Sequence, residues 1–503
     1  MDCARTATES RRAVKPRDGR RRTQPHALQS GDTFVRHLIG IWSAALHATA
    51  FASGVPAGRL AAQVEPWRQY ASPEAAGFSP AQLAAVGRYA DSLGSGALMV
   101  VYRGHVLAAW GDVAREFQAH SVRKSLVSAL YGATVGEGRI DLEATLADLG
   151  IDDTTPLTAV EKTARVRDLL AARSGVYLPA AYAPPDQDEE RPVRGSHRPG
   201  THWFYNNWDF NVAGVIYERV TGENLYDAFR RRIAAPIGME DFDTSDGFLA
   251  YEPSLSRYPA HTFRMSTRDL ARVGLLYLQE GRWRGRQVVP ADWVRKSTTP
   301  LSDLGNGAGY GYMWWTYGRT SSPSRYPAIN RYQRLFQARG TGGQAVFVIP
   351  EAELVIVHRG DTDHGRSVAG SRIWDMVERI VAARTGQPEP QARLVPLSPT
   401  PLASQLPAPA PLRLVQLDHT TIDYLGTYEF SPGRGARVFL FAGRLFLSMP
   451  SRGEAELFAL SPTEFTIRVL SGVRVTFEKN DRGAVAGLTV QLGPERMRGT
   501  KVP

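Results

Sequence analysis

The sequence predicts a mixed α/β (α+β) fold: helices flank an antiparallel sheet, a helical domain is inserted between its two halves, and a small all-β barrel follows at the C-terminal end. Strand-like patterns occur at residues 97–110 and return only at residues 344–358, while the long segment between them has mainly helical periodicity. Beyond a proline-rich stretch at 387–412, short strands follow at regular spacing. These three observations predict the fold class.

The first half of the predicted sheet begins with a helix and a hairpin. Residues 80–91 have the spacing of an amphipathic helix, and Ser79 stands at the position of its N-cap. Residues 97–103 and 105–110 are apolar segments separated by Gly104, a pattern typical of a β-hairpin.

The inserted segment is helical, and the second half of the sheet follows it. Residues 344–349 and 353–358 predict a second hairpin, which turns at Pro350. Further helices, the last of which closes the domain, are predicted at 121–136, 166–173, 209–220, 267–278 and 372–382.

Composition divides the chain into parts. The proline-rich stretch predicts a linker with few contacts across it, so a chain ending near Gly386 should fold on its own. The predicted parts are a basic leader with a signal-like segment (1–65), the helix-flanked domain (66–386), the linker (387–412) and an all-β accessory domain (413–503). Strands of the accessory domain are predicted at 424–430, 437–441, 444–448, 454–458, 464–469, 473–477 and 485–490.

The net charge of +10 does not indicate nucleic-acid binding, because residues 1–30 hold eight basic side chains against three acidic ones and no later run is comparable. Residues 34–54 combine a basic start, an apolar stretch and an A-x-A-like end near Ala50, as in a secretory signal peptide. We expect a periplasmic or secreted protein without a stable membrane span, with initiation near Val35. The alternative is a basic tail followed by a membrane anchor.

The sequence argues against several other kinds of site. Cys3 is the single cysteine, so there is neither a disulfide framework nor a thiolate metal site. The eleven histidines are scattered, and residues 361–364 (DTDH) lack the clustered ligands of a zinc hydrolase. No G-x-S-x-G motif is present. We therefore expect no metal and no cofactor.

A serine and a lysine at the start of a predicted helix carry the main chemical hypothesis. Ser121 and Lys124 are three residues apart, so they share a helix face near the positive end of the helix dipole. Lysine occurs only at positions 15, 124, 162, 296, 479 and 501, and arginine is the usual cation. A desolvated lysine can act as a general base, whereas arginine cannot. The alternative is a capping serine beside a lysine that reaches solvent.

Tyr205 and Asn207 form a Y-x-N pattern in a polar, aromatic loop before a predicted helix. A tyrosine hydroxyl can shuttle a proton, and an asparagine amide can hold both a substrate carbonyl and the lysine. The alternative is an aromatic loop packed on the core.

Residues 338–344 (ARGTGGQ) lead into a strand and are rich in glycine. Glycines let a substrate approach the backbone, so one N–H of this stretch could form an oxyanion hole with the N–H of Ser121. A simple hairpin turn explains these glycines equally well.

Together and in this order, the three patterns resemble the serine β-lactamase-like superfamily: class C β-lactamases, penicillin-binding D-peptidases, related esterases and, nearest, 6-aminohexanoate-dimer hydrolases. The resemblance covers roughly residues 70–385 and implies a β-lactamase/transpeptidase-like fold. It is carried by 121–132 (SVRKSLVSALYG), 199–210 (PGTHWFYNNWDF), 264–272 (RMSTRDLAR) and 342–344 (GGQ).

The resemblance implies a serine hydrolase that acts on a small ester or amide. The roles it implies are nucleophile for Ser121, general base for Lys124, proton shuttle for Tyr205, substrate and lysine contact for Asn207, and second oxyanion donor for the N–H of Thr341 or of Gly340.

One departure from the family pattern bears on the substrate. Many relatives carry Lys-Ser/Thr-Gly, or a histidine in place of the lysine, on the third strand, where this chain has residues 337–339 (QAR). The cation that receives a β-lactam carboxylate is therefore missing from its usual place, unless Arg339 replaces it. We expect esters and linear amides to be cleaved well ahead of β-lactams. The competing interpretation is a penicillin-recognising sensor or scaffold on the same fold, acylated with little turnover.

Overall fold

The computed structural model describes residues 65–184, 187, 189–318, 325–409, 412–416, 419–450 and 452–502. The basic leader and the signal-like segment 34–54 lie outside these ranges. Within them, no helix combines the length and the apolar character needed to cross a bilayer.

The six predicted helices begin and end close to their expected positions, and α6 (Leu225–Phe229) and α8 (Ala291–Ser297) are additional. At the start of the first, the Ser79 side chain accepts a hydrogen bond from the Gln82 N–H, as expected of an N-cap. The helices are α1 (Pro80–Ser92), α2 (Val122–Gly136), α3 (Val166–Leu170), α5 (Asn207–Thr221), α6 (Leu225–Phe229), α7 (Thr267–Leu278), α8 (Ala291–Ser297) and α9 (Gly370–Ala382).

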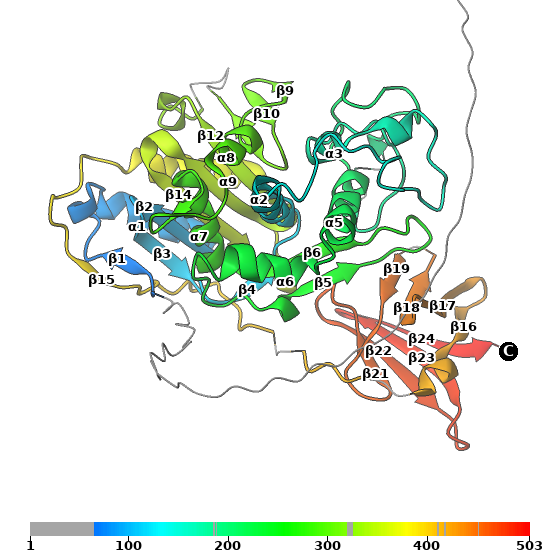
Figure 1. Cartoon of the computed structure of the whole chain (residues 1–503). Helices are drawn as coiled ribbons and strands as arrows, with labels where there is room; N and C mark the ends of the chain where they lie inside the picture. Colours follow the sequence, from blue (N-terminus) through cyan, green and yellow to red (C-terminus); the bar gives the residue numbers. More distant parts are fainter. Residues whose placement is uncertain are drawn as a thin grey trace, which may run out of the picture. The chain divides into compact units, whose positions relative to one another are not determined.

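A ten-stranded sheet in the order β15-β1-β3-β2-β14-β13-β12-β11-β10-β9 forms the body (Figure 1). The early hairpin β2–β3 joins the late hairpin β13–β14 through antiparallel β2 and β14, in which Val100 lies opposite Ile356. The predicted two-part antiparallel sheet is confirmed. Its strands are β1 (Arg68–Tyr70), β2 (Ser95–Tyr102), β3 (His105–Gly111), β9 (Ser302–Gly305), β10 (Ala308–Tyr310), β11 (Trp315–Tyr317), β12 (Leu335–Gly340), β13 (Gln344–Ile349), β14 (Leu354–Gly360) and β15 (Leu394–Pro396).

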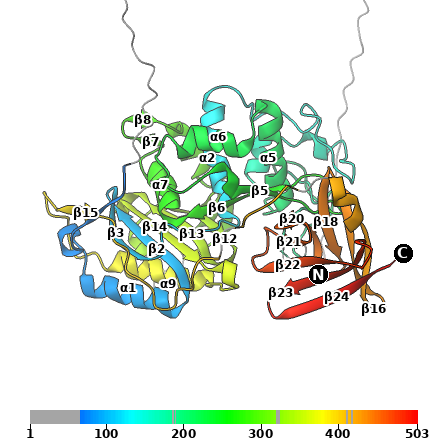
Figure 2. The same ribbon diagram turned by 90° about the horizontal axis from the view of Figure 1, so that it is seen from below.

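Helices cover both faces of this sheet because alternate residues of its central strands point to opposite sides. Leu98 and Val100 of β2 belong to a core shared with α1 and α9. Met99 and Val101 belong to a second core shared with α2 and α7. Figure 2 shows α1 and α9 on one side of the sheet and α7 on the other.

The inserted region lies between the two halves of the sheet and contains α3, α5 and α6. Its small sheet has the order β4-β6-β5, with β4 at Glu116–Gln118, β5 at Gly247–Ala250 and β6 at Ala260–Ser266. The chain passes from β4 through Ala119 and His120 into α2, so this sheet sets where α2 begins. A two-stranded hairpin, β7 (Arg282–Trp283) and β8 (Arg286–Gln287), follows α7.

The C-terminal strands form a second, nearly closed sheet in the order β19-β18-β17-β16-β24-β23-β22-β21-β20, with its own apolar core. The predicted all-β barrel is confirmed, and it contains a further strand, β24, that the sequence did not suggest. The strands are β16 (Gly426–Ser431), β17 (Arg434–Phe441), β18 (Arg444–Met449), β19 (Gly453–Glu456), β20 (Phe458–Ala459), β21 (Glu464–Thr466), β22 (Val473–Lys479), β23 (Val485–Leu492) and β24 (Glu495–Val502).

Part of the predicted linker packs on the main sheet. β15 pairs with β1, with Leu394 opposite Tyr70. The Thr400 N–H donates to the Ala109 carbonyl, and Leu402 is buried. A chain cut near Gly386 would lose this edge strand and its contacts.

Candidate active site

Ser121 lies at the junction of β4 and α2, immediately before the first helical residue. Its side chain does not cap the helix; Oγ instead accepts a hydrogen bond from Lys124 Nζ, 2.8 Å away. The preceding residue, His120, has φ +47°, a left-handed conformation that side chains other than glycine rarely adopt. This turn directs the serine into a cavity that it helps to line.

Lys124 is buried and forms no ion pair with a carboxylate in the part of the chain that the structure describes. Its Nζ lies 4.6 Å from the centre of the Tyr205 ring and 4.9 Å from that of Phe210. Burial, assisted by the charge of Arg123, lowers the pKa of Lys124 well below its usual value. The neutral amine is therefore favoured, and it can accept a proton from the serine.

Tyr205 lies beside both Ser121 and Lys124. Burial raises its pKa, while a hydrogen bond to Ser121 and the charges of Arg123 and Arg339 act in the opposite direction. The phenol stays protonated near neutral pH and interacts with the nucleophile, so it is able to pass a proton. Its ring also packs against Trp315, with ring centres 5.4 Å apart.

Asn207 is the first residue of α5 and is buried, and it is not among the residues that line the cavity. Its amide nitrogen donates to the Tyr182 carbonyl, and its Oδ1 has no hydrogen-bond partner among the described residues. Its own N–H donates to Gln187 Oε1 at 3.0 Å, and Gln187 Nε2 donates to the Tyr205 carbonyl at 2.8 Å. Gln187, absent from the sequence-based site, thus bridges the main chain on both sides of Asn206.

The glycine-rich stretch lies beside the nucleophile. A Cβ added to Gly340, at the end of β12, would come within 2.7 Å of the Ala119 oxygen and 3.0 Å of the Ser121 nitrogen. Only glycine lets the strand approach the nucleophile this closely. No described residue accepts a hydrogen bond from the Ser121 N–H. Both Gly340 and Thr341 line the same cavity, so either N–H can complete an oxyanion hole with it.

The cavity has a volume of about 780 Å³. Arg339 lies in its wall with the guanidinium 4.4 Å from the centre of the Trp315 ring, and it pairs with no carboxylate among the described residues. Gln337, the first residue of the QAR segment, accepts a hydrogen bond from the Tyr317 hydroxyl. The lining includes Ser121, Trp203, Tyr205, Trp315, Arg339 and Trp374.

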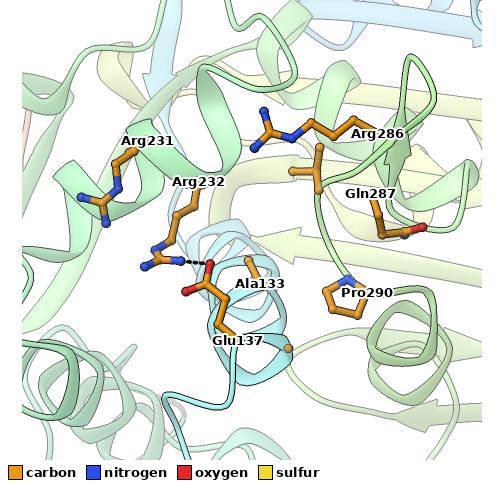
Figure 3. A pocket seen from close by; sticks show the side chains of 9 residues that line it. Ala133, Glu137, Arg231, Arg232, Arg286, Gln287 and Pro290 are labelled. Atoms are coloured by element: carbon orange, nitrogen blue, oxygen red, sulfur yellow. Dashed lines mark hydrogen bonds and ion pairs between the residues drawn. The ribbon is translucent and has the colours of Figure 1, made fainter.

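A second cavity lies at the other end of α2, and it contains none of the predicted site residues. Figure 3 shows Arg231, Arg232 and Arg286 around it, with an ion pair between Arg232 and Glu137. Within the described ranges, no group of three or more histidine, cysteine, aspartate or glutamate side chains is placed to hold a metal ion.

The fold and this serine–lysine–tyrosine arrangement define a protein of the serine β-lactamase type. The Beta-lactamase family model matches residues 82–369, more than half of the chain, so the protein belongs to that family.

Several solved structures are similar to this chain. One is a Bacillus anthracis protein described as a candidate 6-aminohexanoate-dimer hydrolase, with 21% identity over 59% of this chain and 80% of that one and a TM-score of 0.45. A β-lactamase from Mycobacterium bovis has 24% identity over 61% and 100% and a TM-score of 0.43. An octameric penicillin-binding protein homologue from Pyrococcus abyssi has 16% identity over 83% and 99% and a TM-score of 0.44.

Proposed function

We propose that the protein is a serine hydrolase that cleaves ester or linear amide bonds through an acyl-enzyme on Ser121. The observation that carries the proposal is the 2.8 Å contact between the Ser121 hydroxyl and a buried lysine amine with a strongly lowered pKa. A serine needs an adjacent base to attack a carbonyl, and no carboxylate among the described residues pairs with this lysine to hold its proton.

In acylation, Lys124 Nζ takes the proton of the Ser121 hydroxyl as Oγ attacks the substrate carbonyl carbon. The carbonyl oxygen becomes an oxyanion that the N–H of Ser121 and the N–H of Gly340 or Thr341 stabilise. Tyr205 passes a proton to the leaving alcohol or amine as the bond to it breaks. Water then attacks the acyl-enzyme by the same steps in reverse order, and Ser121 regains its proton.

The substrate preference that we propose is for esters and linear amides over β-lactams. The nucleophile can attack any carbonyl, so discrimination between substrates must come from the residues of the cavity wall. Gln337 occupies the usual cation position and is neutral. Loss of one charge-assisted hydrogen bond to a β-lactam carboxylate costs roughly 1.5–3 kcal/mol, about ten- to a hundredfold in selectivity. Arg339 is the cation in the wall that is able to replace it.

The test is covalent labelling with a fluorophosphonate, followed by kinetics on p-nitrophenyl esters, short amides and nitrocefin. We expect labelling of Ser121 and steady-state turnover of the esters. A burst of acylation without turnover would instead support the acyl-binding sensor. A nitrocefin kcat/KM equal to that for p-nitrophenyl butyrate would contradict the substrate preference, and its loss in Arg339→Gln would identify Arg339 as the replacement cation.

We also propose that the protein is exported and processed near Ala50, on the strength of the signal-like pattern at 34–54. The check is N-terminal sequencing of the protein recovered from a periplasmic or culture fraction. Protein that retains residues 34–54 in the membrane fraction would favour the anchor.

A further inference from the structure

The residue before the nucleophile is held from both sides by hydroxyl groups. His120 Nδ1 lies 3.0 Å from the Tyr182 hydroxyl, and His120 Nε2 lies 3.0 Å from Thr362 Oγ1. The Tyr182 ring is parallel to the imidazole, and Gln118 Nε2 donates to the Tyr182 hydroxyl. Burial and the nearby Arg359 lower the pKa of His120 to about 4, so the ring is neutral near pH 7 and donates from one nitrogen only.

Thr362 also contacts the opposite side of the oxyanion hole. A Cβ added to Gly342 would come within 2.1 Å of the Thr362 methyl carbon, and Gly342 has φ +76°. Gly342 lies in the turn Thr341–Gly343, directly after Gly340 and Thr341. One threonine therefore touches the residue before Ser121 with its hydroxyl and the glycine turn with its methyl group.

The segment that carries Thr362 is itself fixed by buried charges. Arg115 donates to both oxygens of Asp361 at 2.7 and 3.2 Å, and to Asp363 at 3.2 Å. Arg264 donates to both oxygens of Asp363 at 3.0 and 2.6 Å. The side chains of Arg115, Asp361 and Asp363 are nearly inaccessible to solvent. Paired charges of this kind hold a loop rigidly, because breaking one pair leaves an uncompensated buried charge.

From these contacts we propose that Thr362 is a positioning residue for the oxyanion hole. Its hydroxyl holds His120 in the left-handed conformation that aims the Ser121 N–H into the cavity, while its methyl group sets the distance to the turn that follows Gly340. The proposal rests on the proposed serine hydrolase function. It adds a residue that touches neither the substrate nor the reacting atoms and acts through the main chain of its neighbours.

Thr362→Val is the test, because valine keeps the methyl contact and loses the hydroxyl. Losing an oxyanion donor outright costs about 100- to 1,000-fold in kcat, so we expect its displacement to cost about tenfold. KM for p-nitrophenyl butyrate should stay unchanged, and fluorophosphonate labelling should slow by the same factor as kcat. Thr362→Ser keeps the hydroxyl and loses only the methyl contact with the turn, so it should lose clearly less activity than Thr362→Val. A wild-type kcat in the valine variant, or equal losses in both variants, would overturn the proposal.

Thr134→Val is the matched control. The Thr134 hydroxyl is buried in α2 and donates to the Leu130 carbonyl, more than three turns from Ser121. Its loss should lower the melting temperature and leave kcat unchanged. A loss of kcat in Thr362→Val that merely followed its melting temperature, as in this control, would contradict a positioning role.

Two further variants test the proposal even if Thr362→Val does not fold. Tyr182→Phe removes the hydroxyl on the other side of the imidazole and should also lower kcat without raising KM; unchanged kinetics would count against the proposal. Asparagine tolerates the left-handed conformation, so in a His120→Asn background Thr362→Val should cause little further loss of kcat. Fully additive losses would contradict coupling through His120. Loss of labelling in Ser121→Ala tests the hydrolase function separately.

Discussion

Two cavities lie at the two ends of α2, and the cation that α2 or its neighbours place near each end has a different environment. At the N-terminal end, Lys124 is buried with a hydroxyl as its partner, and burial lowers its pKa. At the C-terminal end, Arg232 pairs with Glu137 and Glu223, and the hydrogen bond to Glu137 raises its pKa. A buried lysine without a counter-ion can act as a base, whereas a guanidinium paired with carboxylates keeps its charge.

The largest expected effect is that of Ser121→Ala at the catalytic end. The variant should lose turnover and fluorophosphonate labelling completely, because the attacking oxygen is gone. Its melting temperature should be close to that of the wild type, since removing one hydroxyl opens no large cavity. Labelling that persists would end the assignment of the nucleophile.

Lys124→Arg tests the comparison directly, because it places a guanidinium, the cation found at the C-terminal end of α2, in the position of the buried lysine. Guanidinium keeps its proton at working pH, so we expect a loss of about a hundredfold or more, the scale for a general base. The measurement is kcat/KM on p-nitrophenyl butyrate. Activity close to that of the wild type would mean that the residue only balances charge.

The next largest effect is expected in the pH dependence of kcat/KM. The lysine works as the neutral amine, so the rate should fall as pH drops through its lowered pKa, about tenfold per pH unit on that limb. The limb should lie well below the ordinary lysine range. A rate that climbs only near pH 10 would show that Lys124 is an ordinary, solvated ammonium.

Tyr205→Phe should have a smaller effect, because the ring that packs against Trp315 and Lys124 stays in place. We expect turnover to slow while the melting temperature changes little, since only the proton-shuttling hydroxyl is lost. Differential scanning calorimetry beside steady-state kinetics separates the two. A fall in melting temperature comparable to that of a core truncation would favour a packing role.

Glu137→Gln is the smallest expected change, and it disturbs the other end of the comparison. Glu137 is exposed, so its pair with Arg232 should contribute about 1 kcal/mol or less to the free energy of unfolding. Chemical denaturation should register that loss, and kcat should not move. A marked loss of activity would mean that the two ends of α2 are coupled.

Local patterns predicted much of this molecule. The spacing of Ser121 and Lys124 places both at one helix start regardless of the tertiary structure, and the structure shows them in contact. The alternating apolar segments likewise predicted β2, β3, β13 and β14. The catalytic roles themselves stay predictions that the variants above test.

The remainder depends on contacts distant in sequence or on polar residues. Thr362 reaches His120 across more than 240 positions, and neither residue has a local signal. β24 escaped prediction because most of its residues are exposed and polar, so its sequence carries no apolar alternation. β15 lies in a proline-rich stretch whose composition suggested a linker, yet its main chain pairs with β1.

The pairing of β2 with β14 also governs how the chain must reach this structure. β2 is synthesised early, but one of its edges stays open until residues 354–360 arrive. Until then, an apolar strand with free backbone groups is exposed, which slows folding and favours aggregation. Trp374 of α9, part of the cavity wall, comes later still. The nascent chain therefore carries its serine and lysine long before it has a cavity for them to act in.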